Sequence, residues 1–172
     1  MTRYAALGAT LALLLAGCAT MGGSGPKATA KLEPTKGNAA AGTVEFVERG
    51  GKVVVTASIT GLKANAEHGF HVHEKGDCSS GDGMSTGGHF NPDGKPHGPP
   101  GAPHHAGDLP ALVADAAGAA KATFTLDGVT VAAGPNSIVG RGLIVHKDPD
   151  DYKTQPTGNS GARIACGVIQ AG

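Results

Sequence analysis

The residues best suited to chemistry in this 172-residue chain are histidines, and they are crowded into one stretch. Seven of the eight lie between His68 and Asp108, and the eighth, His146, stands alone further along the chain. The same stretch is dense in glycine and proline and has no hydrophobic periodicity. Imidazoles gathered in this way on irregular chain indicate a metal site built on loops.

A first group of candidate ligands is expected on strands. His71 and His73 are two residues apart in the predicted strand 69–73, so both side chains point to the same face, with Cα atoms about 6–7 Å apart. His146 ends another apolar run, 142–146, and can complete the set. Three neutral imidazoles with an open position suit Cu(II). The alternative is that these are surface histidines or hydrogen-bonded core histidines.

A second group of candidate ligands lies in or at the end of a long loop. His89, His97, His105 and Asp108 follow one another at spacings of 8, 8 and 3 residues. Three nitrogens and one carboxylate oxygen form the closed set that structural Zn²⁺ prefers, and zinc bound there would order the loop. A solvated histidine-rich loop is the alternative, and spacing alone does not separate His104 from His105.

The elements that must position these residues read as short strands separated by turns. The hairpin 43–59, with a turn at 49–52, has the clearest pattern of alternating and β-branched residues. Further runs are predicted at 69–73, 109–113, 119–126, 142–146 and 162–169, and long loops at 74–107 and 147–161. About eight strands without helices predict an all-β antiparallel sandwich or barrel. A loop as long as 74–107 must be held by metal or by a disulfide.

The N-terminus reads as an export signal. Arg3 precedes an apolar run, 4–16, which is too short to cross a bilayer about 30 Å thick. The run ends in Leu-Ala-Gly-Cys at positions 15–18, which resembles the signal of bacterial lipoproteins, so we expect cleavage before Cys18 and lipidation of its thiol. The alternative is an ordinary signal peptide with a chance cysteine nearby. Both predict an exported protein.

The expected organisation is a signal peptide at 1–17, a flexible tether at 18–27 and one folded domain at 28–172. Ala19 follows the predicted lipidated cysteine in place of the aspartate linked to inner-membrane retention. We therefore expect a lipid-anchored protein of the cell envelope or periplasm, with the outer membrane preferred. Without Arg3, 13 Lys and Arg face 14 Asp and Glu. This balance and the lack of basic tracts argue against a nucleic-acid partner.

Two cysteines, Cys78 and Cys166, remain if Cys18 carries lipid. Export permits a disulfide between them. Free thiols, or one cysteine that binds metal, are the alternatives.

Several motifs, in order along the chain, resemble one family, the Cu,Zn superoxide dismutases. GFHVHE at 69–74 resembles the family's copper-binding signature, and GARIACGVI at 161–169 is similar to its C-terminal signature. Segments 88–92, 97–98 and 105–109 look like its bridging and zinc-ligand segments. The resemblance spans about 43–169 and implies a Greek-key, immunoglobulin-like sandwich or flattened barrel with two long functional loops.

The resemblance also implies roles for single residues. Copper would be held by His71, His73, His89 and His146, and zinc by His89, His97, His105 and Asp108, with His89 bridging the two. Asp150 would link a copper ligand to a zinc ligand, Arg163 would be the active-site arginine, Thr157 would narrow the channel, and Cys78 and Cys166 would form the disulfide. The family's pattern selects His105 over His104, which is then expected to be exposed, and makes His68 a structural residue hydrogen-bonded to nearby backbone.

The activity implied is the dismutation of superoxide to oxygen and hydrogen peroxide, with one copper and one zinc per subunit, to protect the cell envelope. His89 would supply a proton, and Arg163 would attract the anion. A copper-binding or copper-delivery protein on the same fold is the alternative, and it would need neither Arg163 nor the channel. Family members occur as single chains and as homodimers. The loops 78–89 and 148–159 carry their own sequence, which leaves the dimer geometry and the steering charge open.

Overall fold

The structure is a computed structural model, and it describes Met1 and residues 25–172. The predicted signal peptide, the lipidation site Cys18 and most of the predicted tether lie outside the described residues. The strands are β1 (Lys27–Pro34), β2 (Ala41–Arg49), β3 (Lys52–Thr60), β4 (Glu67–His68), β5 (Phe70–His73), β6 (Leu112–Val113), β7 (Ala120–Leu126), β8 (Gly142–His146) and β9 (Arg163–Ala171). A single 3₁₀ turn, η1 (Met84–Thr86), is the one helical element of these residues, and it is too short to cross a membrane.

Seven of the strands form one antiparallel sheet in the order β5-β8-β9-β1-β2-β3-β7, and β4 and β6 pair separately. The sheet curls around a single hydrophobic core, so the predicted all-β sandwich or flattened barrel is confirmed. The hairpin β2–β3 is confirmed as well. Gly50 and Gly51 form its two-residue turn with φ of 58° and 76°, the conformation that the right-handed twist of a hairpin favours.

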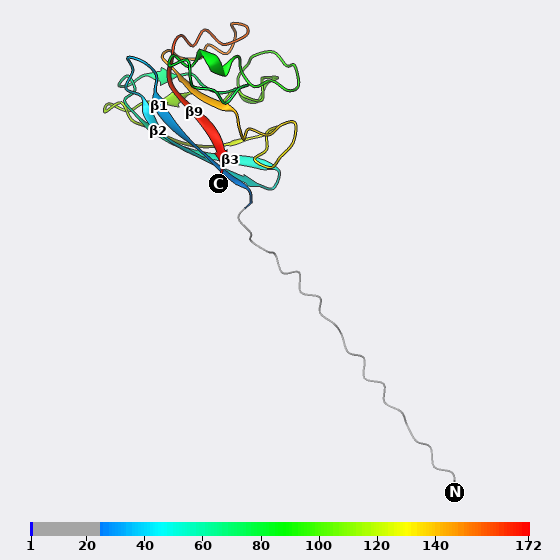
Figure 1. The fold of residues 1–172 in the computed structure, drawn as a ribbon. Coiled ribbons are helices and arrows are strands. Elements are labelled where there is room, and N and C mark those ends of the chain that lie inside the picture. The colour runs from blue at the N-terminus through cyan, green and yellow to red at the C-terminus, as the bar shows by residue number, and fades with distance from the viewer. Residues whose placement is uncertain (2–24) are drawn as a thin grey trace.

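The burial pattern explains which strands carry the site. β1 and β3 alternate between buried and exposed residues, as expected for strands with one face on the core and one in water. Every residue of β5 and β8 is buried, because their second face lies under the long loops. Figure 1 shows these loops gathered at one end of the sheet, away from the C-terminus. Side chains on the outer face of β5 and β8 are therefore shielded from bulk water.

Some elements were not predicted. β1 alternates on Ala28, Ala30 and Leu32, and two of these three residues are alanines, which are weak strand formers. β4 and β6 have two residues each, too few for a periodic pattern. The strand expected at 109–113 is shortened to β6.

Candidate metal centre

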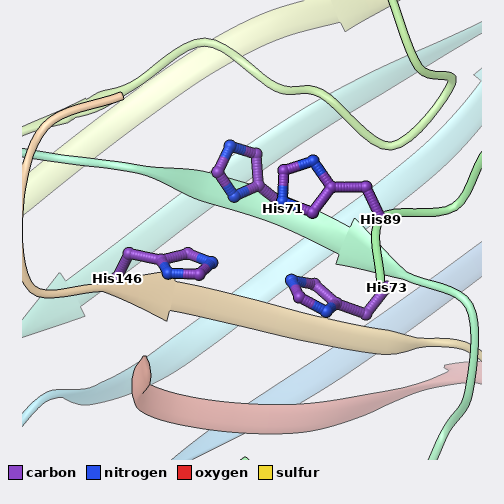
Figure 2. Close-up of side chains that lie close together, drawn as sticks. All are labelled: His71, His73, His89 and His146. Atoms are coloured by element: carbon purple, nitrogen blue, oxygen red, sulfur yellow. The ribbon is translucent and has the colours of Figure 1, made fainter. Parts of the chain in front are cut away.

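The first group of histidines converges as the strand geometry predicts. β5 carries His71 and His73, β8 ends at His146, and His89 reaches them from the loop after β5 (Figure 2). All four side chains are buried, and each offers a ring nitrogen, all within 4.8 Å of one another. Four imidazoles at this separation can bind one ion.

Backbone hydrogen bonds explain why the loop brings His89 to β5. The amide of Phe90 donates to the Val72 carbonyl (2.8 Å), and the Val72 amide donates to the Gly107 carbonyl (2.9 Å). The loop therefore pairs with β5, and His73 lies opposite His89. A Cβ at Gly107 would collide with the carbonyl oxygen of Val72, so this close approach requires glycine.

A β-bulge brings Arg163 beside the histidines. The pairing of β8 and β9 shifts between Val145, which lies opposite Ala165, and His146, which lies opposite Arg163. Ile164 is thus the extra residue of β9 at this point. Bulges of this kind re-aim side chains next to functional sites. Here the bulge makes the arginine the direct neighbour of His146.

Ring nitrogens without partners show that the first group fits a metal ion. Nδ1 of His73 donates to the Gly87 carbonyl (2.9 Å), and Nδ1 of His146 donates to the Gly161 carbonyl (3.1 Å). The carbonyls can only accept, so the proton is fixed on Nδ1 and Nε2 keeps a lone pair. The buried nitrogens that have no hydrogen-bond partner include Nδ1 of His71 and Nε2 of His73, His89 and His146. Such lone pairs are costly to bury unless an ion binds them.

The second group also comes together. His89, His97, His105 and Asp108 are all buried, and their ligand atoms lie within 4.8 Å of one another. Nδ1 of His97 is 3.0 Å from Oδ2 of Asp108, yet the pair does not meet hydrogen-bond geometry. A lone pair beside a carboxylate oxygen is the arrangement expected of two ligands to one cation. Three nitrogens and one carboxylate oxygen fit Zn²⁺.

Asp150 joins the two groups from behind. Its Oδ2 accepts from Nε2 of His71 (2.7 Å), and its Oδ1 accepts from Nε2 of His97 (2.9 Å). These bonds fix the proton of each ring on Nε2 and leave Nδ1 free. One carboxylate therefore orients a histidine of the first group and a histidine of the second.

The electrostatics favour neutral imidazoles at His71, His73 and His146 and an ionised carboxylate at Asp108. Burial lowers the pKa of His146 to about 4, although the hydrogen bond to Gly161 opposes the shift. Burial, and then the charge of neighbouring His89, also hold the pKa values of His71 and His73 below their usual range. The pKa of Asp108 is lowered overall, because its hydrogen bond from His89 and the nearby imidazoles outweigh the opposing effect of burial. Neutral imidazoles and an ionised carboxylate are the forms that bind metal.

Arg163 is held firmly in place. Its guanidinium donates to the carbonyls of Gly83 (2.7 Å) and Gly87 (2.8 Å) and to Oγ1 of Thr86 (2.8 Å). The side chain is about half buried, and burial lowers its pKa without removing its charge. The Gly87 carbonyl accepts from both Arg163 and His73, so the arginine is tied to a ligand of the first group.

The predicted disulfide between Cys78 and Cys166 is confirmed, with Cα atoms 5.9 Å apart. The bridge joins two parts of the chain that meet at Arg163. Cys78 lies in the loop that contains Gly83, Thr86 and Gly87, the hydrogen-bond acceptors of Arg163, and Cys166 lies on β9, the strand that carries Arg163. The loop 74–107, which needed an anchor in the sequence analysis, is thus attached covalently.

Three other predicted residues have clear positions. His68 donates from Nδ1 to the His146 carbonyl (2.8 Å), as expected of a structural residue. His104 is partly exposed and belongs to neither metal group, and its ring bends back onto the Ala102 carbonyl (2.7 Å). Thr157 is half-buried in the loop between β8 and β9, and its carbonyl accepts from Ser160 (3.4 Å).

Three residues outside the two metal groups make contacts that the sequence did not predict. Thr86 lies between Arg163 and Nδ1 of His73 (3.2 Å), and Gln155 and Tyr152 contact His97. None of these residue types suggests a metal site, and the spacing of the chain does not connect them to the histidines.

Comparisons with known proteins agree with this geometry. The profile of the family described as copper/zinc superoxide dismutase matches residues 40–169. Superoxide dismutase [Cu-Zn] 2 of Brassica juncea is 49% identical over 137 residues, covering 74% of this chain and 88% of that protein. Superoxide dismutase [Cu-Zn] 2 of Aquifex aeolicus is 43% identical over 150 residues, covering 84% of this chain and 86% of that protein.

Solved structures share the fold. The clock protein EA4 superposes with a TM-score of 0.77 at 41% identity, covering 86% of this chain and 96% of its own. A double mutant of a SOD-like protein from Bacillus subtilis gives a TM-score of 0.74 at 38% identity, covering 83% of this chain and 96% of its own. The chain therefore belongs to the copper/zinc superoxide dismutase family, and it is an enzyme of superoxide dismutation that uses copper and zinc.

Proposed function

We propose that superoxide is dismuted at a copper held by the ring nitrogens of the first group, His71, His73, His89 and His146. A zinc held by His89, His97, His105 and Asp108 would keep the shared ring of His89 in place. The observation that carries this assignment is that these four histidines offer ring nitrogens within 4.8 Å of one another and that each has a buried ring nitrogen without a partner. Each of these nitrogens in His71, His73 and His146 belongs to a ring whose other nitrogen is already bonded to an oxygen.

Copper held by these histidines would supply one-electron redox chemistry, by which one superoxide is oxidised to oxygen and a second, with two protons, is reduced to hydrogen peroxide. The chain must then bind an anion and deliver a proton. Arg163 is suited to the first task because its charge is permanent and three hydrogen bonds fix its guanidinium beside His146. Nε2 of His89 is suited to the second, since Nδ1 of that ring faces Asp108 (2.8 Å) and Nε2 has no protein partner.

Thr157 is proposed to narrow the entry to the copper, as the family resemblance implies. It is half-buried and lies two residues after Gln155. Gln155 contacts His97 in the loop between β5 and β6, residues 74–111, which we call the zinc loop. A small β-branched side chain at an entry limits the size of what can enter without adding a charge that repels an anion.

We also propose that the protein acts in the cell envelope, anchored by lipid on Cys18, with the outer membrane preferred. The apolar run, Leu-Ala-Gly-Cys at 15–18 and Ala19 support this proposal. The disulfide agrees with an oxidising compartment. Mass spectrometry of the mature protein tests it: a lipid-modified N-terminal cysteine is expected, and an unprocessed N-terminus would contradict it. A homodimer, which the family resemblance allows, stays a prediction.

A copper-delivery protein is the competing function, and the bonded position of Arg163 argues against it, because a carrier has no need to orient an anion. An activity assay separates the two functions. Superoxide dismutation is measured for the protein from Ala19 onward, loaded with copper and zinc, and for its His146→Ala variant. Strong activity that the substitution abolishes is the expected result. Full occupancy by both metals with no activity would leave the carrier function as the better account.

A further inference from the structure

One side chain outside the metal groups holds the backbone of His97 from two directions. The amide of His97 donates to Oε1 of Gln155 (2.8 Å), and Nε2 of Gln155 donates to the His97 carbonyl (2.9 Å). A primary amide has both an acceptor and donors, so one glutamine satisfies both backbone groups of one residue, as a neighbouring strand would. Gln155 lies in the loop between β8 and β9, 58 residues from His97 in the sequence.

The same loop also holds the ring of His97. Oδ1 of Asp150 accepts from Nε2 of the ring (2.9 Å), and the amide of Tyr152 donates to that same oxygen (2.7 Å). The ring of Tyr152 lies nearly parallel to the imidazole, at 9°, with the ring centroids 6.3 Å apart. The Tyr152 hydroxyl accepts from the amide of Ala111 (3.0 Å), which fastens the loop to the chain just before β6.

The loop is shaped for these contacts. Asp151 accepts from the amides of Lys153 (2.9 Å) and Thr154 (2.8 Å), which curls the chain just before Gln155. Between residues 147 and 161 two lysines face three aspartates, a formal charge of −1. This net charge gives the segment no overall attraction for an anion. Its visible contribution to the site is its hydrogen bonds to histidines of both metal groups, including His97.

We propose that Gln155 is a positioning residue that sets the backbone of His97, so that Nδ1 of His97 points at the zinc. The inference rests on the proposed role of His97 as a zinc ligand. Gln155 does not touch the metal: it acts through the backbone, while Asp150 acts on the ring. Next to His97, the Gly98 amide donates to Oδ2 of Asp108 (3.3 Å), a second backbone hydrogen bond that holds this segment. Without Gln155 the direction of Nδ1 is set by the ring contacts and by the Gly98 contact, and no hydrogen bond holds the backbone of His97 itself.

The experiment compares Gln155→Ala with Gln170→Ala, which removes the other glutamine of the chain, an exposed residue on β9. Three quantities are measured on the purified mature protein: amide exchange at His97 without metal, zinc affinity against a chelator, and the visible spectrum with Co²⁺ in place of zinc. For Gln155→Ala we expect faster exchange at His97, about tenfold weaker zinc binding and a shifted Co²⁺ spectrum, because residues that orient a ligand typically change metal affinity by about 10–100-fold. Gln170→Ala should match the wild type in all three.

Gln155→Glu keeps the acceptor for the His97 amide but loses the donor to the His97 carbonyl, so it should fall between wild type and Gln155→Ala. Faster exchange in Gln155→Ala with unchanged zinc affinity and Co²⁺ spectrum would overturn the proposal, since Gln155 would then only tie two loops together. His97→Ala separates this failure from a failure of the ligand assignment. If His97→Ala binds zinc as tightly as the wild type, His97 is not a ligand and the proposed function is at fault.

Discussion

The two metal groups share His89, but they are built on different supports. Three of the four proposed copper ligands, His71, His73 and His146, lie on strands that are buried on both faces. All of the proposed zinc ligands lie on the loop between β5 and β6. Sheet hydrogen bonds and the core therefore fix most of the copper group, whereas the zinc group depends on contacts that the loop makes with other segments.

The difference teaches that one chain can fix one metal group through strand pairing and the other through contacts between loops. The pairing register of β5 and β8 sets the separation of His71, His73 and His146, so this separation does not depend on bound metal. The zinc loop is held instead by the disulfide, by pairing with β5 and by the loop that carries Asp150 and Gln155. We expect metal removal to loosen the zinc loop more than the copper strands. The following predictions, from the largest effect to the smallest, test that contrast.

Removal of a strand-borne ligand should affect activity without affecting the fold. His71→Ala should lower dismutation by more than about a thousandfold, since loss of a direct ligand exceeds the 10–100-fold that loss of an orienting residue costs. Zinc binding should be retained, because His71 is not in the second group, while thermal stability should fall because the substitution leaves a cavity at a fully buried position. His104→Ala is the matched control, because His104 lies on the same loop as the zinc residues but in neither metal group. A His71→Ala protein with near-normal activity would show that the copper site is elsewhere.

Removal of the disulfide should affect the loop more than the sheet. The bridge closes a segment of 88 residues, and its loss in a Cys78→Ser, Cys166→Ser variant should lower the free energy of unfolding by about 2–5 kcal/mol. Denaturant titration measures this loss. Hydrogen exchange should rise in residues 79–88 and stay low in Phe70–His73 and Gly142–His146. Equal increases in all three segments would mean that the strand-borne group is not independently held.

Asp150 touches both groups, so its substitution tests how they are coupled. Asp150→Asn keeps the size of the side chain but cannot accept from His71 and His97 through two oxygens. Copper and zinc affinities should each fall by about 10–100-fold. Asp115→Asn is the matched control, because Asp115 is exposed, bonds within its own turn and belongs to neither metal group. If the zinc affinity falls and the copper affinity does not change, the sheet orients His71 without help from Asp150.

Arg163 lies on β9, but its guanidinium is held by Gly83, Thr86 and Gly87 of the loop after β5. Its removal should give the smallest of the four effects. Arg163→Ala should lower dismutation by about tenfold at low salt, because electrostatic steering raises encounter rates by about 10–10³-fold. It should also weaken the dependence of the rate on ionic strength, with metal content unchanged. Arg49→Ala, at the exposed turn of β2 and β3, is the control. An unchanged salt dependence in Arg163→Ala would remove its steering role.

The strand-borne part of the site could be predicted from the sequence because strand periodicity is a local property. The alternation around His71 and His73 and the apolar run ending at His146 place these rings without knowledge of the rest of the fold. For the loop-borne part, spacing and residue type indicated the group, and the family resemblance was needed to choose His105 over His104. Gln155 and Tyr152 could not be predicted because their partners are distant in the sequence and their contacts with His97 run through backbone and ring packing.

The central claim is that the copper group performs the chemistry and the zinc group supports it. Reconstitution of the metal-free protein with each metal tests this claim most directly. Dismutation is measured after loading with zinc alone, copper alone and both metals, with occupancy determined in each sample. No activity with zinc alone and full activity with both metals are expected. Dismutation by the zinc-only protein, or none when both sites are full, would contradict the account.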